Sequence, residues 1–98
     1  NMFKIRKTKE SQTKYELKFR KLYQDESGKN VFIFDIVDMF DDWAGNAVYA
    51  ESKSYDAKDK TYCSFEKGFS LFKSSFYEFD EKDEKYLLEK AQTFVESF

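Results

Sequence analysis

The sequence predicts an α+β fold in which an antiparallel sheet of three to four strands carries C-terminal helices packed on one face. Three observations favour this class. Apolar and charged residues alternate in the first third of the chain, residues 31–34 form a continuous apolar run, and apolar residues near the C-terminus recur at helical spacing. The 98 residues include no proline and only three glycines, so we expect short turns between the elements.

We expect residues 2–98 to form a single domain, because the chain has about the commonest domain size. Asn1 precedes Met2 and is interpreted as a residue added for expression. Although 37% of the residues are charged, 20% are aromatic, and this composition disfavours disorder. No stretch approaches the roughly 20 apolar residues of a membrane span. The single cysteine, Cys63, favours a reducing, cytoplasmic setting.

The first third of the chain reads as three strands. Residues 3–6 and 15–20 alternate apolar with charged side chains, which is typical of half-buried strands. Residues 31–34 are apolar throughout, so we expect a central strand there. Gly28 and Asn30, just before it, can adopt positive φ angles. The pattern therefore predicts an antiparallel hairpin of 15–20 with 31–34, and the strand over 3–6 beside 15–20.

The middle of the chain carries two patterns of helical spacing. Ile36, Phe40 and Trp43 predict a short helix over 36–44, which a fourth strand over about 48–55 would follow. Between residues 61 and 79, six aromatic residues recur at spacings of three and four, which favours a helix with an aromatic stripe. The alternative is a hairpin that turns at 66–68, because glycine is a poor helix residue and aromatic residues favour strands.

The last element is predicted to be a helix over residues 81–97. Asp80 can accept hydrogen bonds at its N-terminus, and Asp83 at the third helical position would complete a capping box. One face of this helix is apolar, and it comprises Leu87, Leu88, Ala91, Phe94, Val95 and Phe98.

The residue types exclude several classes of enzyme. The chain has no histidine, so serine–histidine and cysteine–histidine nucleophilic sites are excluded. One cysteine without histidine cannot build a common zinc site, and the three isolated glycines form no phosphate-binding loop. We therefore expect a non-enzymatic protein that needs no cofactor.

One carboxylate pattern leaves an enzymatic alternative open. Asp35, Glu51 and Lys53 weakly resemble the D…ExK pattern of metal-dependent nucleases. The resemblance implies that the two carboxylates would hold a divalent cation and that the lysine would help to activate water. These three residues would have to lie on adjacent strands.

An acidic and aromatic segment is the preferred candidate for a binding site. Its residues are Asp35, Asp38, Phe40, Asp41, Asp42 and Trp43. Carboxylates can bind Ca²⁺ or Mg²⁺, but the segment lacks the calcium-loop pattern, so no metal site is expected. Exposed rings among acids are typical of a hot spot for a basic protein partner. The alternative is that both rings pack in the core.

The function that these residues predict is protein binding, as an inhibitor or immunity-type protein that blocks a partner. The alternative is nucleic-acid binding, because residues 1–30 hold nine basic and four acidic residues, whereas residues 31–98 hold eight and fifteen. Lys4, Arg6, Lys18 and Arg20 would then form a positive sheet surface that contacts phosphates.

Overall fold

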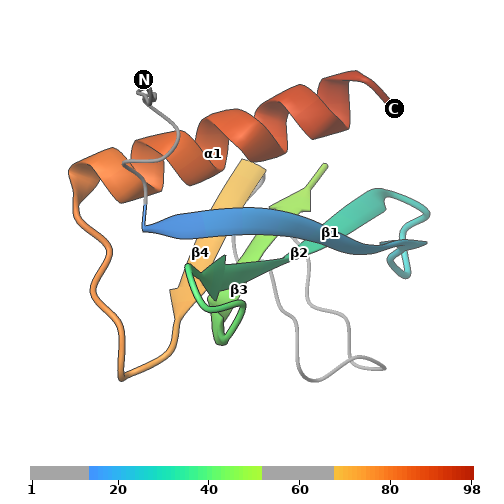
Figure 1. The fold of residues 1–98 in the computed structure, drawn as a ribbon. Coiled ribbons are helices and arrows are strands. Elements are labelled where there is room, and N and C mark those ends of the chain that lie inside the picture. Colours follow the sequence, from blue (N-terminus) through green and yellow to red (C-terminus); the bar gives the residue numbers. More distant parts are fainter. Residues whose placement is uncertain (1–13, 52–67) are drawn as a thin grey trace.

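A computed structural model describes residues 14–51 and 68–98, which form a four-stranded antiparallel sheet and one helix (Figure 1). The strands lie in chain order across the sheet. The elements are β1 (Tyr15–Gln24), β2 (Asn30–Asp38), β3 (Trp43–Ala50), β4 (Gly68–Lys73) and α1 (Glu81–Glu96). The α+β class and the antiparallel sheet are confirmed, with one helix in the described part of the chain.

The β1–β2 hairpin confirms the first predicted pairing, and both strands are longer than the sequence indicated. Its turn is organised by Asp25, whose Oδ1 accepts hydrogen bonds from the backbone N–H groups of Ser27 (2.9 Å) and Lys29 (3.0 Å). Gly28 supplies a φ of 83°, which an L side chain rarely adopts. The predicted strand over 3–6 lies outside the described residues.

The central strand β2 is apolar on both faces of the sheet. On one face, Phe32 and Phe34 belong to a buried cluster that also includes Leu87 and Ala91 of α1. On the other face, Val31 and Ile33 form a second buried cluster, with Val48 and Ala50 of β3. This two-sided burial explains why the run is continuously apolar rather than alternating.

The prediction of a helix over 36–44 is wrong. Strand β2 continues to Asp38, a tight turn occupies the next residues, and β3 begins at Trp43. The helical spacing of Ile36, Phe40 and Trp43 was coincidental, since the three side chains lie in a strand, a turn and the next strand. The predicted fourth strand overlaps the end of β3, and residues 52–55 lie outside the described part.

The helix favoured over 61–79 is also wrong where the structure describes it. Residues 68–73 form β4, and an irregular connection leads from there to α1. Phe69 pairs with Tyr49 and packs on the cluster beneath α1, whereas Phe72 pairs with Asn46 and lies on the opposite face. Of the alternative turn at 66–68, only Gly68 lies within the described residues.

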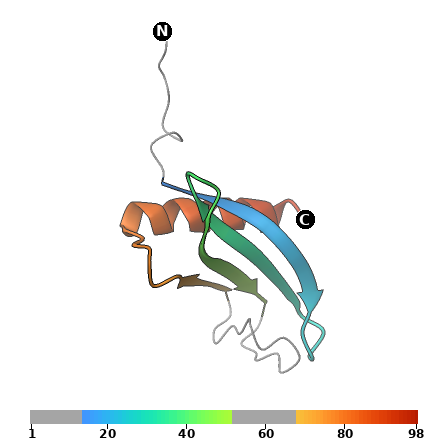
Figure 2. The same cartoon turned by 60° about the horizontal axis from the view of Figure 1, so that its bottom comes forward.

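The C-terminal helix begins as the sequence predicts. The Asp80 side chain accepts a hydrogen bond from the Asp83 N–H (2.9 Å), and the Asp83 carboxylate accepts one from the Asp80 N–H (3.0 Å), which forms the predicted capping box. Figures 1 and 2 show α1 running along one side of the sheet. Its Phe94 ring meets Phe34 edge-on at 5.6 Å, and the helix contacts β1 and β3.

Replacing Leu87 by alanine should destabilise the fold, because its fully buried side chain joins the cluster of β2 to α1. We expect a loss of about 2–5 kcal/mol in the free energy of unfolding, the usual range for a buried leucine. Urea denaturation would measure it. The exposed Thr93→Ala should change the value by less than about 0.5 kcal/mol. Equal effects of the two variants would contradict this packing.

Candidate functional site

The turn between β2 and β3 is closed by the side chain of Asp38. Its Oδ1 accepts hydrogen bonds from the backbone N–H groups of Phe40 and Asp42, both at 2.9 Å. The backbone closes the same loop, since the Asp38 N–H donates to the Asp42 carbonyl (2.8 Å) and the Asp41 N–H donates to the Asp38 carbonyl (3.0 Å). Asp41 adopts a φ of 67°, a conformation that aspartate tolerates better than most residues. The turn is therefore held in one shape by local bonds.

A second contact joins this turn to the connection between β4 and α1. The Tyr77 hydroxyl donates to Asp38 Oδ2 (2.9 Å), and the Ser74 N–H donates to the Ala44 carbonyl (2.8 Å). The hydrogen bond from the Asp42 backbone, helped by Tyr77, lowers the pKa of Asp38 below its ordinary value. The bond to Asp38 raises the pKa of the Tyr77 hydroxyl. Two segments distant in sequence thus share one end of the molecule.

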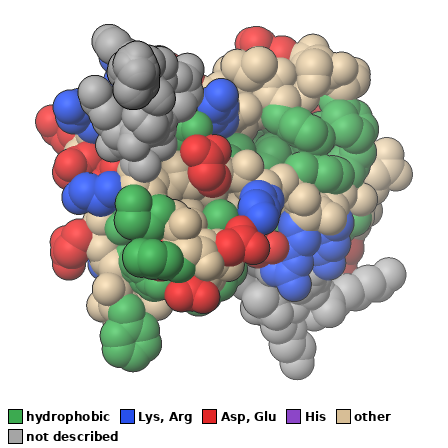
Figure 3. Space-filling view, in the orientation of Figure 1, with side chains coloured by type: hydrophobic (Ala, Val, Ile, Leu, Met, Phe, Trp, Pro, Cys, Tyr) green, Lys and Arg blue, Asp and Glu red, His purple; other side chains and the backbone are tan. Residues whose placement is uncertain are grey.

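Large apolar side chains are exposed at this end. The exposed fractions are 72% for Met39, 77% for Phe40, 51% for Trp43 and 90% for Phe76. The alternative that Phe40 and Trp43 pack in the core is therefore wrong. Figure 3 shows hydrophobic and acidic side chains close together at the lower left of the molecule, the end where Figure 1 places this turn and connection. We name Met39, Phe40, Asp41, Asp42, Trp43 and Phe76 the turn surface.

The predicted acidic residues do not all belong to the turn surface. Asp41 and Asp42 are exposed in the turn, whereas Asp38 is half-buried and occupied with hydrogen bonds. Asp35 lies in the middle of β2, half-buried, and accepts a hydrogen bond from Asn46 Nδ2 (2.9 Å). It holds the sheet together rather than facing outward with the rings.

Two of the residues predicted to contact nucleic acid lie beside the acids. Lys18 Nζ is 2.6 Å from Asp41 Oδ1, and Arg20 Nη1 is 3.6 Å from Asp35 Oδ1. Lys4 and Arg6 lie outside the described residues. Lys18 and Arg20 are therefore each paired with an acid of the other candidate set, which leaves less positive charge for phosphates than the sequence suggested.

The carboxylates of the nuclease-like pattern are kept apart. Glu51 Oε1 accepts a hydrogen bond from the Asn30 N–H (3.0 Å) at one end of β2. Asp35 lies five residues along that strand, a distance of about 16 Å at the rise of a β-strand. Lys53 lies outside the described residues. Within 14–51 and 68–98, no group of histidine, cysteine, aspartate and glutamate side chains could hold a metal ion.

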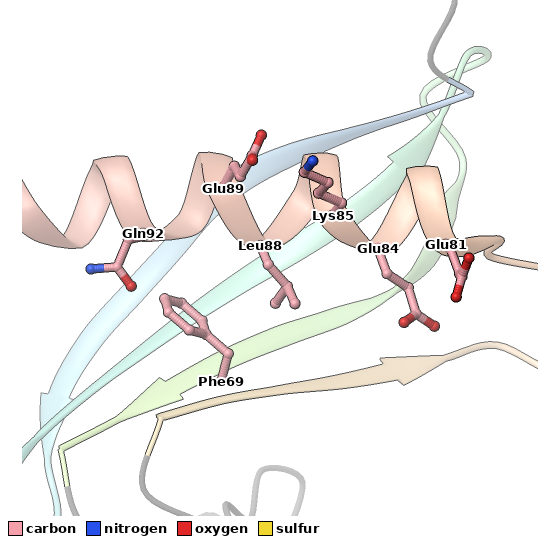
Figure 4. A pocket seen from close by; sticks show the side chains of 7 residues that line it. All are labelled: Phe69, Glu81, Glu84, Lys85, Leu88, Glu89 and Gln92. Carbon is pink, nitrogen blue, oxygen red and sulfur yellow. The ribbon is translucent and has the colours of Figure 1, made fainter.

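A groove between α1 and β4 is a feature that sequence reasoning missed. Phe69 lies on the strand side, and the other lining residues come from the helix (Figure 4). The lining comprises Phe69, Glu81, Glu84, Lys85, Leu88, Glu89 and Gln92. The groove is shallow and widely open to solvent, and its volume is about 630 Å³. Because residues 68–79 were expected to be helical, no signal indicated that this part of α1 would face a strand.

Comparisons with known proteins give no relative: no family model, curated protein or solved structure matches the chain. In the described segments, α1 is too short and too polar to cross a membrane.

Acidification should loosen the turn only when the pH falls below the ordinary pKa of a carboxylate. The pKa of Asp38 is lower in the folded state than its unfolded value of 3.8. Its carboxylate therefore stabilises the fold fully at a pH above 3.8, and this stabilisation is lost as the pH falls through the lowered pKa. An NMR titration of the Asp38 carboxyl carbon should therefore give a midpoint below 3.8. Tyr77→Phe, which removes one of the stabilising hydrogen bonds, should move that midpoint upward. A midpoint at or above 3.8 in the unmodified protein would contradict this geometry.

Proposed function

We propose that this protein is a small, non-enzymatic binding module that uses the turn surface to hold or block a protein with a basic surface, in the manner of an inhibitor or immunity protein. The observation that carries the proposal is the exposure of Phe40 and Trp43 at a turn that hydrogen bonds hold in shape, together with the exposure of Phe76 on the adjoining connection between β4 and α1. Clustered exposed rings on a protein surface commonly mark an interaction site.

The fixed shape of the turn favours tight binding. A flexible loop would lose conformational freedom on association, whereas this one is already ordered by Asp38 and by the contact with Tyr77. Full burial of a large apolar side chain stabilises a complex by about 1.5–3 kcal/mol. Met39, Phe40 and Phe76 would together give about 4.5–9 kcal/mol, and Trp43, which is only 51% exposed, would add less than a full share. The total lies within the range of the cost of association, about 4–15 kcal/mol.

Electrostatic attraction therefore contributes to binding in addition to the burial of the rings. Asp41 and Asp42 are exposed beside them, and complementary charge speeds the encounter with a basic partner and disfavours acidic ones. Lys18 compensates part of the charge of Asp41, so Asp42 is the acid with more to contribute. The absence of histidine supports a non-enzymatic role, since the chain lacks the commonest general base.

Capture experiments with turn-surface variants test this proposal. The unmodified protein should capture one defined protein from a lysate of its source cells, and Phe40→Ala with Asp42→Lys should reduce capture at least about tenfold, since such hot-spot losses exceed about 1.4 kcal/mol. Asp38 is left intact because it holds the turn. The purified partner and isothermal titration calorimetry would then give the affinities.

Matched controls make the same kinds of change, a phenylalanine to alanine and an acid to lysine, at the opposite end of the molecule. Phe98 is 67% exposed near the C-terminus, and Glu26 is exposed in the β1–β2 turn. Phe98→Ala and Glu26→Lys should leave capture unchanged. Equal capture by all the variants would show that the turn surface is not the binding site.

Nucleic-acid binding is the second candidate, and Lys18 and Arg20 are its described residues. Their carboxylate neighbours make it the weaker one. Affinity for a labelled single-stranded oligonucleotide that falls steeply with salt, and falls further in Lys18→Ala, would favour it over protein binding.

A further inference from the structure

The groove between α1 and β4 combines an apolar floor with a charged rim. Phe69 and Leu88 are half-buried and point toward each other across it (Figure 4). Glu81 and Glu84 project from the first turns of α1 toward β4 (Figure 4). We propose that this groove binds a short basic segment of a protein, in which an apolar side chain is flanked by lysine or arginine.

The charges on the rim favour a positively charged segment. Glu81 and Glu84 contribute two negative charges on the side of α1 that faces β4, whereas the side chains of Lys85 and Glu89 point away from the strand (Figure 4) and their charges cancel, so the net charge of the lining is −2. The positive end of the α1 dipole does not cancel this charge, because the carboxylates of Asp80 and Asp83 already cap it. An acidic or neutral segment would gain nothing from this field, whereas a basic one would be attracted to it.

The floor favours an apolar side chain, and the length of the lining along α1 determines how long the bound segment is. Leu88 and Phe69 remain half-buried because, within residues 14–51 and 68–98, α1 makes its main contacts with β1 and β3 and forms a groove with β4. The lining extends along the helix from Glu81 to Gln92, which is about 16 Å at the helical rise of about 1.5 Å per residue. About five residues in an extended conformation cover that length.

The proposal goes beyond the function assigned to the turn surface, since none of the groove residues belongs to it. A basic segment could bind here whether or not the rings of the turn contact a partner. The two ideas can therefore fail separately, and the variants below distinguish them.

An NMR titration of the full-length protein with three pentapeptides tests the groove. The probes are Lys-Leu-Lys-Leu-Lys, its serine analogue Lys-Ser-Lys-Ser-Lys and its acidic analogue Glu-Leu-Glu-Leu-Glu. We expect saturable shifts of the Phe69 and Leu88 signals with the first peptide alone. Shifts of equal size and affinity with the serine analogue would reduce the effect to non-specific charge attraction and overturn the proposal, as would an absence of saturable shifts in the groove.

Charge variants provide a test in both directions. Glu81→Gln with Glu84→Gln should weaken binding by about 2- to 25-fold, the range for two exposed charge pairs, whereas Lys85→Gln, whose side chain points away from β4, should tighten it by less than about 5-fold. Glu26→Gln, in the distant β1–β2 turn, is the matched control and should have no effect. Phe40→Ala with Asp42→Lys should also leave peptide binding unchanged. If Glu81→Gln with Glu84→Gln leaves binding unchanged, or if Glu26→Gln weakens binding as much as the groove variants do, the proposed site is wrong.

Discussion

The structure depends on the burial of β2 on both of its faces. Phe32, Phe34 and Ile36 pack beneath α1, and Val31 and Ile33 join the second cluster with β3. Asp35 is the polar exception in the middle of the strand, and an isolated carboxylate there would be costly. Asn46 and Arg20, from the strands on either side, supply the polar partners that make it tolerable. The central strand is thereby fixed in register with both neighbours.

This fixed strand explains why large rings are exposed at its end. Once β2 runs to Asp38, the next residues lie beyond the sheet, where α1 does not cover them. The hydrogen bonds of Asp38 then reverse the chain within four residues and hold Phe40 outward. A longer loop could have folded its rings back onto the core, but this turn is too short to do so. The local polar bonds therefore determine the exposure, and the apolar surface is a consequence of the turn's geometry.

Sequence reasoning identified the elements whose pattern arises from local contacts. The hairpin with Gly28 and the helix capped by Asp80 were predicted because turn and capping residues act within a few positions. It was wrong about the helices over 36–44 and 61–79, where spacing alone gave the signal. Phe69, Phe72 and Phe76 have helical spacing, but they lie beneath the helix, on the opposite face of the sheet and in an exposed connection. Only long-range strand pairing decides among these environments, and periodicity carries no information about it.

The same limit applied to the candidate site. Asp38, Asp41 and Asp42 lie in or beside one turn because they are close in sequence, but the roles that separate Asp38 from the other two depend on Tyr77 and Lys18, which come from other elements. The groove could not be predicted for the same reason, since it exists only where α1 faces β4.

Both surfaces combine apolar side chains with an excess of carboxylates, so the charge would hasten encounters with many basic molecules. Discrimination among those molecules must then come from the shape of the apolar parts, because the charge attracts them all alike.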